Sequence, residues 1–308
     1  MNPLVSLVVT TKNEEMNIEN CLRSLAEQTY SNTEIIVIDN YSTDKTKNLS
    51  FRFTSLVFDK GPERSAQRNE GMLRIAKGKY CCYFDADMLA SKYLIEDAVD
   101  QLELGIEIGL YVREVVLGNS LFAKVRRFER QFYDATVIDA ARIFRRDSFI
   151  QSGGFSEEIF QSGSGEDWDL DKSIRLHGKL GMLTSKESKN SSRRENEWLL
   201  DLASNLGVSL PKTFNGILHN EGTDSLFSYL KKKTYYARGF QGYINKWGKN
   251  DKDIRLQFGL RYRLFIVFLE DQKWKKVLRQ PMLFVGVFCL KVLIGLVTFR
   301  KFKKFPGY

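Results

Sequence analysis

The sequence predicts an α/β protein with a doubly wound, mostly parallel sheet, followed by a helical C-terminal extension that associates with a membrane. Short, nearly continuous apolar runs alternate with amphipathic helical patterns over the first third of the chain, which is typical of βαβ units. Acidic residues stand directly after two of these runs, and the last quarter of the chain is basic and helical in pattern.

The elements of the first 104 residues follow from the positions of these runs. Runs rich in β-branched and aromatic residues predict strands at 4–10, 34–39, 54–58 and 80–84. Apolar residues at helical spacing predict helices at 16–28, 64–77 and 92–104. Right-handed crossovers between parallel strands place such helices on both faces of one sheet.

Beyond residue 105 the alternation is less regular. The predicted strands are 108–117, 136–144, 179–184 and 214–218. The predicted helices are 121–132, 166–177, 196–206, 226–247, 254–270 and 281–299, and a polar stretch at 186–195 predicts an exposed loop.

The net charge of +9, from 47 Lys and Arg against 38 Asp and Glu, is unevenly distributed. Residues 231–308 hold 19 of the basic and 4 of the acidic residues, a net of +15, which leaves −6 on residues 1–230. A basic tail indicates an anionic partner, either a membrane surface or nucleic acid. The four cysteines form no CxxC pair, which predicts reduced thiols in the cytosol and argues against a disulfide framework or a zinc site.

Polar residues follow the first, second and fourth predicted strands. Ligands bind outside the carboxyl ends of the strands of an open parallel sheet, where these side chains converge. Helix capping is an alternative role for Asn13 and Asp44. The residues are Thr10, Thr11, Asn13 and Glu14, then Asp39, Asn40, Ser42 and Asp44, and finally Asp85 and Asp87.

Asp85-Ala86-Asp87 ends a buried strand in the middle of the predicted sheet. Residues i and i+2 of an extended segment point to the same side, so both carboxylates face one space. Two like charges held together are unfavourable unless a cation lies beside them, and Mg²⁺ is usually bound by one or two carboxylates and by substrate phosphates. The motif therefore predicts a metal–diphosphate site, with a solvated turn as the alternative.

Taken in order, these motifs resemble those of membrane-associated family 2 glycosyltransferases, whose nucleotide-sugar-binding fold is of the GT-A type. The resemblance covers residues 4–182, and Asn40 departs from it because an acidic residue is more usual there. It implies a glycosyltransferase domain over 1–222, with a nucleotide-sugar half (1–104) and an acceptor half (105–222), before a basic helical region over 223–308. The matching segments are Val5–Glu14, Cys21–Leu25 with Gln28–Tyr30, Glu34–Asp44, Arg68–Gly71 and Phe84–Asp87.

The resemblance implies four residues that bind the nucleoside diphosphate sugar. Asp39 would accept a hydrogen bond from the nucleotide base, with Thr11 and Glu14 beside it. Arg68 would lie near the base or the diphosphate.

The resemblance also implies a divalent ion, Mg²⁺ or Mn²⁺, on the diphosphate. Asp87 would ligate it, and Asp85 would contact the ribose or the metal. A divalent ion stabilises the charge that accumulates on a leaving diphosphate. His219, which follows the last predicted strand, would complete the metal site, and Mn²⁺ accepts imidazole more readily than Mg²⁺ does. An acceptor-site or structural role is the alternative for His219.

The second half of the domain contains a segment that resembles the acceptor motif of the family. Gly153-Gly154-Phe155 precedes Gly165–Leu170, in which a carboxylate at the start of a helix acts as general base on the acceptor hydroxyl. We expect Asp167 to be that base, Glu166 to orient it or the sugar, and Trp168 to contact substrate. Complementing the helix dipole is the alternative role for these carboxylates.

The basic tail interleaves charged with apolar residues. Residues 229–239 predict a basic, aromatic helix, and 281–299 is apolar except for Lys291 near its centre. Nineteen residues are barely enough to span a bilayer, and basic flanks on both sides favour helices that lie in the interface of an anionic leaflet. A single span and a soluble core element are the alternatives.

Together these features predict an inverting, metal-dependent glycosyltransferase of the hexosyltransferase class on the cytoplasmic face of the cell membrane. It would use a lipid-linked or cell-surface polysaccharide precursor as acceptor, and we expect no nucleic-acid partner. One alternative is a sugar-phosphate nucleotidylyltransferase, although the Gly-rich basic loop of that class is missing after the first strand. The other is a non-catalytic protein that binds membranes or nucleic acid through its tail.

Overall fold

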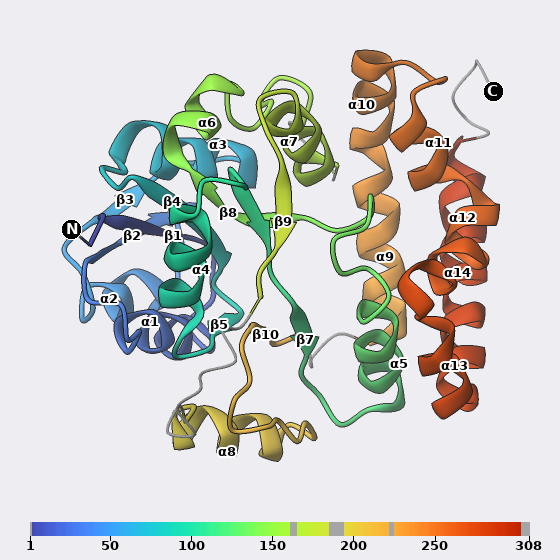
Figure 1. Cartoon of the computed structure of the whole chain (residues 1–308), viewed down its shortest axis with the longest axis horizontal. Coiled ribbons are helices and arrows are strands. Elements are labelled where there is room, and N and C mark those ends of the chain that lie inside the picture. Colours follow the sequence, from blue (N-terminus) through green and yellow to red (C-terminus); the bar gives the residue numbers. More distant parts are fainter. Residues whose placement is uncertain (1, 161–164, 185–193, 222–224, 303–308) are drawn as a thin grey trace.

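The computed structural model describes residues 2–160, 165–184, 194–221 and 225–302, with side chains described to residue 297. A seven-stranded sheet forms the N-terminal body, in the order β3-β2-β1-β4-β8-β6-β9 (Figure 1). All neighbours pair in parallel except β8, which runs antiparallel to β4 and β6, so the predicted mostly parallel sheet is confirmed. The strands are β1 (Val5–Thr11), β2 (Thr33–Asp39), β3 (Val57–Asp59), β4 (Tyr80–Asp85), β6 (Gly109–Tyr111), β8 (Ala141–Arg145) and β9 (Leu180–Met182).

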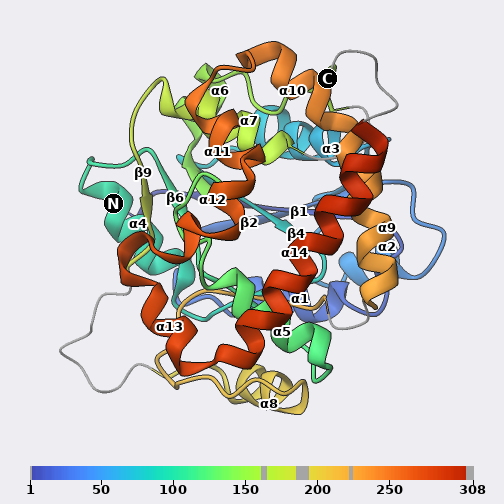
Figure 2. The ribbon, with the colours of Figure 1, turned by 90° about the vertical axis from the view of Figure 1, so that its right-hand side faces the viewer.

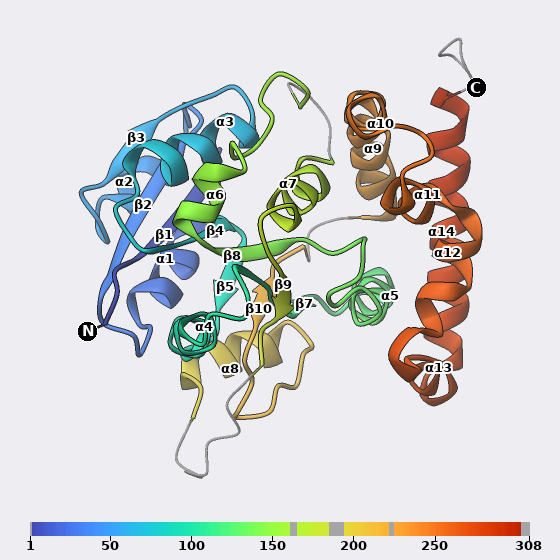
Figure 3. The ribbon, with the colours of Figure 1, turned by 45° about the horizontal axis from the view of Figure 1, so that its top comes forward.

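Helices cover both faces of this sheet, as expected for a doubly wound fold (Figures 1 and 3). Successive residues of β1 point to opposite faces, so Leu7 belongs to one core and Val8 to the other. Burial on both sides explains the continuous apolar runs in the sequence. One face carries α1 (Ile18–Ala26), α2 (Thr46–Ser50) and α4 (Leu94–Glu103). The other carries α3 (Arg64–Asn69) with its π-helical continuation η1 (Glu70–Ile75), α6 (Arg146–Gln151) and α7 (Glu166–Arg175).

A second, three-stranded sheet lies at the carboxyl ends of the main strands. Its central strand β10 (Ile217–His219) pairs antiparallel with β5 (Met88–Ala90) and parallel with β7 (Glu114–Val116). Met88 is the register partner of His219, which brings His219 beside Asp87. Helix α8 (Glu197–Asn205) packs against this sheet.

The C-terminal helices form a separate layer that packs on α5 (Leu121–Arg130) (Figures 1 and 2). Val125 and Phe128 of α5 share a core with Tyr229, Val287 and other apolar residues of this layer. A Cβ on Gly286 would lie 2.6 Å from Val125 Cγ2, so this glycine permits the close approach of α14 to α5. The helices are α9 (Leu226–Tyr236), α10 (Phe240–Trp247), α11 (Lys252–Phe258), α12 (Leu260–Leu264), α13 (Trp274–Arg279) and α14 (Pro281–Phe302).

Several predicted boundaries are wrong. The single strand predicted at 108–117 is two strands, β6 and β7, which belong to different sheets. The strand predicted at 136–144 begins only at Ala141, and the helix predicted at 254–270 is interrupted after Phe258 and again after Leu264. Most of the predicted loop at 186–195 lies outside the described residues.

A helix that spans a membrane must be both long and apolar. None of the described helices alone is long and apolar enough to cross a bilayer. The segments Glu270–Arg279 and Pro281–Val297 meet the length and composition criteria only as a pair, and they are bent by 116° relative to each other.

Candidate functional site

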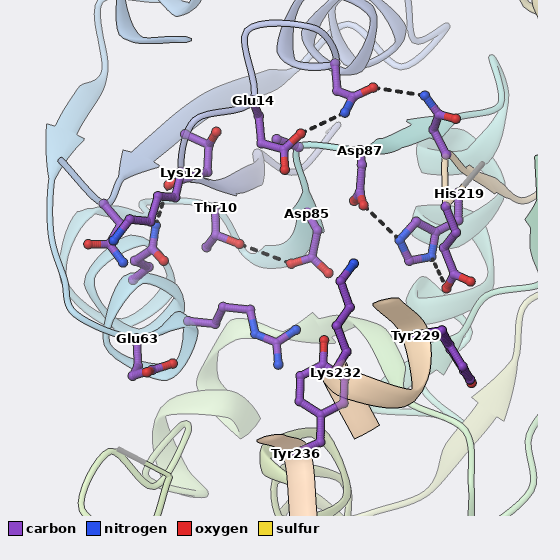
Figure 4. Close-up of a pocket in the computed structure, with 18 of the residues that line it drawn as sticks. Thr10, Lys12, Glu14, Glu63, Asp85, Asp87, His219, Tyr229, Lys232 and Tyr236 are labelled. Carbon is purple, nitrogen blue, oxygen red and sulfur yellow. Dashed lines mark hydrogen bonds and ion pairs between the residues drawn. The ribbon is translucent and has the colours of Figure 1, made fainter. Parts of the chain in front are cut away.

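The carboxyl ends of β1, β2 and β4 surround a cavity of about 580 Å³, here called the first cavity (Figure 4). Thr11, Glu14, Asp85, Asp87 and His219 all line it, so the structure brings together five of the predicted site residues. Helix α9 closes the opposite side, and its Lys232 side chain extends into the cavity toward Asp85 (Figure 4).

Asp85 is held by cations at the end of β4. Its Oδ1 accepts hydrogen bonds from Thr10 Oγ1 at 3.2 Å and Arg68 Nη2 at 3.0 Å, and its Oδ2 lies 3.9 Å from Arg142 Nη1. Burial disfavours the charged form of Asp85, but Arg68, Arg142 and Arg64 outweigh burial and hold its pKa well below the usual range. Asp85 therefore stays ionised at any physiological pH.

Asp87 has one oxygen paired and the other unpaired. Its Oδ2 lies 3.3 Å from His219 Nε2, whereas Oδ1 is buried without a hydrogen-bond partner among the described residues. His219 Nδ1 lies 3.7 Å from Glu114 Oε2 and 3.6 Å from Glu221 Oε1. Burial disfavours the imidazolium, but Asp87 and these carboxylates raise the pKa of His219 well above its usual value.

These residues fit a divalent ion only in part. Within the described ranges no group of three His, Cys, Asp or Glu side chains is close enough to hold a metal by itself, and Asp85 faces Arg68 instead. The unpaired Oδ1 of Asp87 is the kind of buried oxygen that a cation satisfies. One or two carboxylates completed by substrate phosphates is the usual arrangement for Mg²⁺, so the donor set fits a metal that arrives with a diphosphate.

Arg68 links the metal motif to the predicted general base. Its guanidinium is completely buried, lies 4.3 Å from the centre of the Tyr83 ring, and donates from Nη1 to Asp167 Oδ1 at 2.8 Å. Tyr83 Oη donates to the same oxygen at 2.9 Å. Asp167 Oδ1 is thus doubly held, and Oδ2 has no hydrogen-bond partner among the described residues.

Glu166 faces the interior at the start of α7. The helix begins after Gly165, whose φ of +114° is a conformation that other residues rarely adopt. Glu166 Oε1 lies 2.9 Å from Arg64 and 3.8 Å from Arg68, and Oε2 is buried without a partner in the described structure. Burial raises the pKa of Glu166 despite the opposing effect of Arg64. Glu166 therefore lies in contact with both arginines.

Of the other predicted residues, Thr11 and Glu14 line the first cavity and Asp39 does not. Thr11 has a buried, unpartnered Oγ1 at the first cavity, and Glu14 accepts from Asn17 at 2.7 Å while burial raises its pKa. The two oxygens of Asp39 accept hydrogen bonds from the Ser42 hydroxyl and backbone amide at 2.5 and 2.8 Å.

A second cavity of about 360 Å³ adjoins the first and lies against the C-terminal helices. Asp85 and Arg126 line both cavities, whereas Asp167 and Trp168 line only the second. Trp168 donates from Nε1 to the Ile138 carbonyl at 3.0 Å. Asp85 and Asp167, bridged by Arg68, therefore stand where the two cavities meet.

Sequence reasoning missed basic residues that line both cavities. Arg64 stands four residues before Arg68 on the same helix face, and that spacing could have identified it. Arg126 and Lys233 come from helices whose position over the sheet edge depends on tertiary packing, so no local pattern indicates them.

Comparisons with known proteins show which family and fold the chain resembles. Residues 6–153 match the model of "Glycosyl transferase family 2". Glycosyltransferase AglE of Haloferax volcanii is 30% identical over 109 residues, which is 32% of this chain and 36% of that protein. The Escherichia coli enzyme WfgD, named as a UDP-Glc:α-D-GlcNAc-diphosphoundecaprenol β-1,3-glucosyltransferase, is 25% identical over 128 residues, covering 39% of this chain and 50% of WfgD. The match thus spans about a third to a half of the length of these relatives.

Two solved structures share the fold. Mannosyltransferase PcManGT from Pyrobaculum calidifontis, in complex with GDP-Man and Mn²⁺, has a TM-score of 0.57 at 15% identity, with 98% of this chain and 87% of that chain covered. Residues 1–349 of TarS from S. aureus, in complex with UDP, have a TM-score of 0.51 at 16% identity, with 84% and 71% covered. The predicted GT-A fold is confirmed.

Proposed function

We propose that this chain, whose residues 6–153 match the family 2 glycosyltransferase model, transfers a sugar from a nucleoside diphosphate sugar to a hydroxyl of a lipid-linked or cell-surface glycan precursor, with inversion. Because the chain is similar to glycosyltransferases, the alternative of a sugar-phosphate nucleotidylyltransferase is set aside. PcManGT was solved with GDP-Man and TarS with UDP, which supports a nucleotide-sugar donor here. The lipid-linked acceptor in the name of WfgD supports the acceptor class.

One observation supports this function best: Arg68 joins Asp85, at the edge of the first cavity, to Asp167 in the second. A nucleoside diphosphate in the first cavity would present its sugar at this junction. An acceptor hydroxyl in the second cavity would then face the anomeric carbon from the side of Asp167. This arrangement suits a single displacement, in which the acceptor oxygen bonds to carbon as the bond to the diphosphate breaks.

Asp167 is the general base in this proposal. Arg68 and Tyr83 hold its Oδ1, so Oδ2 is oriented to take the proton from the acceptor hydroxyl in the transition state. Glu166 acts indirectly, because it holds Arg64 and Arg68 in place. Arg64 and Lys232 line the first cavity and would stabilise negative charge on the leaving diphosphate.

Asp87, with Asp85 and His219 beside it, would hold Mg²⁺ or Mn²⁺ together with the donor diphosphate. The metal would act as a Lewis acid on the leaving group. The unpaired Asp87 Oδ1 and the Mn²⁺ in the PcManGT complex support this assignment. The role of Asp39 in recognising the nucleotide base stays a prediction. For that role, Asp39 would have to replace its hydrogen bonds from Ser42 by one from the base.

We also propose that the C-terminal layer attaches peripherally to the cytoplasmic face of an anionic membrane. Large apolar side chains are exposed there at Phe265, Leu269, Met282 and Val285, close to the basic helix α13. Flotation with anionic vesicles tests this at low and high salt, with DNA retention measured in parallel. Flotation without DNA retention supports the proposal, and DNA retention without flotation contradicts it.

A donor screen with matched variants tests the proposed function. The full chain is incubated with UDP-, GDP- and dTDP-sugars in Mn²⁺, in Mg²⁺ and in EDTA, and release of nucleoside diphosphate is measured. We expect release from at least one donor, dependent on metal and lost in Asp87→Ala. Asp201→Ala, which removes an exposed carboxylate on α8, is the control and should match the wild type. No release from any donor, or equal release by Asp87→Ala, contradicts the proposal.

A further inference from the structure

The second cavity contains more basic than acidic side chains. Seven Arg and Lys side chains line it against five Asp and Glu side chains. Glu114 is already neutralised by Arg130 at 2.7 Å and Arg142 at 2.9 Å on the side of the sheet. Basic side chains without a carboxylate partner lie on the opposite wall, which the C-terminal helices form.

Three cations on that wall have no carboxylate partner within 4.0 Å in the described part of the chain: Lys233 of α9, Arg263 of α12 and Lys291 of α14. Lys291 is nine-tenths buried, donates to the Arg263 carbonyl at 2.5 Å, and lies 4.4 Å from the centre of the Phe268 ring. The buried Nε of Arg126 also has no acceptor among the described residues.

Burying a cation without an anion paired to it is unfavourable. Burial lowers the pKa of Lys291 and of Lys233 to about 8 in each case. An anion in this cavity would restore the favourable pairing that these side chains lack.

The same cavity becomes apolar toward the surface. Leu260, Leu264 and Ile294 line it, and Leu260 is 68% exposed, so it belongs both to the cavity and to the outer surface. Gly295 also lines it, and a Cβ there would meet no atom within 4 Å, so there is open space beside α14 at this position. The exposed apolar side chain of Leu296 follows directly on α14.

We propose that the second cavity binds the diphosphate of a polyprenyl-diphosphate-linked acceptor, with Lys291, Arg263 and Lys233 on the diphosphate and the lipid leaving between α12 and α14. The sugar of the acceptor then lies between these cations and Asp167, because in such a molecule the diphosphate joins the lipid to the sugar. This proposal rests on the proposed function and adds the site and the chemical class of the acceptor anchor. The positive charge of the second cavity and its apolar exit together favour an amphipathic ligand over a free sugar.

Binding of farnesyl diphosphate to the full chain tests the proposal without any donor. Calorimetry in EDTA compares the wild type with Lys291→Met, Lys291→Arg and Gly295→Leu, and Lys275→Met removes an exposed lysine of α13 as the control. We expect Lys291→Met to weaken binding about tenfold or more, and Lys291→Arg and Lys275→Met to bind like the wild type. Gly295→Leu should weaken farnesyl diphosphate binding but leave pyrophosphate binding unchanged, because it obstructs only the exit of the lipid.

Three results would overturn the proposal. The first is equal affinity of Lys291→Met and the wild type for farnesyl diphosphate. The second is displacement of farnesyl diphosphate by UDP with Mn²⁺, which would assign it to the first cavity. The third is pyrophosphate binding as tightly as farnesyl diphosphate with no effect of Gly295→Leu, which would indicate a site for free phosphates. Because no donor takes part, these outcomes are independent of the donor screen, and failure of either experiment is recognised separately.

Discussion

Replacement of Arg68 by Met tests whether this arginine holds the junction of the two cavities together. The guanidinium is completely buried and lies 3.0 Å from Asp85 and 2.8 Å from Asp167. Removing one partner of a buried ion pair leaves an uncompensated charge and costs about 3–5 kcal/mol. We therefore expect Arg68→Met to lower the free energy of unfolding by that amount at pH 7.

The loss should depend on pH in a defined direction. The pKa of Asp85 is lowered in the folded protein, so its ionisation contributes stability that is present above its unfolded pKa of about 4 and lost as pH falls further. Without Arg68 this contribution is smaller, because only Arg142, Arg64 and His219 still favour the ionised form of Asp85. The difference between wild type and variant should then be largest at neutral pH and shrink as pH falls below about 4.

Urea unfolding at pH 7, 5, 4 and 3 measures this difference. Arg52→Met is the matched control, because Arg52 forms an ion pair with Glu19 at 2.9 Å in which both side chains are largely exposed. An exposed pair contributes about 0–1 kcal/mol, so the control should change little at any pH. A loss below about 1 kcal/mol in Arg68→Met, or a difference that does not vary with pH, would refute the role given to Arg68.

The remaining predictions concern the base and the C-terminal layer. Asp167→Asn should bind the nucleotide donor like the wild type in calorimetry but lower kcat by about 10²–10⁴, and near-normal turnover would assign the base elsewhere. Lys291→Met should raise the free energy of unfolding by about 1–2 kcal/mol at pH 7, because removal of the buried charge outweighs the loss of the hydrogen bond to the Arg263 carbonyl and of the contact with the Phe268 ring. The stability that Lys291→Met gains over the wild type, measured by urea unfolding, should shrink as pH rises from about 8 to 10.5, because the wild-type lysine loses its charge in the folded state over this range. Gly286→Ala should destabilise the protein by about 1–3 kcal/mol, because the added methyl group would contact Val125. Gly295→Ala, which lies in open space, should stabilise it by about 0.5–1 kcal/mol. Thermal melts in which both variants shift in the same direction would contradict the packing of α14 on α5.

The sequence was most informative where burial is strong and local. β1, β2 and β4 are buried on both faces, so their continuous apolar runs predicted both the strands and the positions of Thr11 and Asp85 at their ends. The three-residue strands β5, β7 and β10 are too short for a period-2 pattern to indicate them, and the register that brings His219 beside Asp87 depends on their pairing.

The basic tail shows why composition alone is incomplete. Its excess charge predicts an anionic partner, but composition does not distinguish side chains on the outer surface from those that face inward. Lys233, Arg263 and Lys291 line the second cavity because α9, α12 and α14 pack as one layer on α5. Tertiary packing thus assigns part of the tail's charge to the candidate acceptor site, and leaves the remainder for the proposed membrane contact.

The anomeric configuration of the product tests the central claim most directly. Once the donor screen identifies a nucleotide sugar, transfer to a synthetic diphosphate-linked acceptor gives a product whose new glycosidic bond can be assigned by NMR. A single displacement, with Asp167 as base on the acceptor side, predicts a configuration opposite to that of the donor. A product that keeps the donor configuration would contradict direct displacement at the junction of the two cavities.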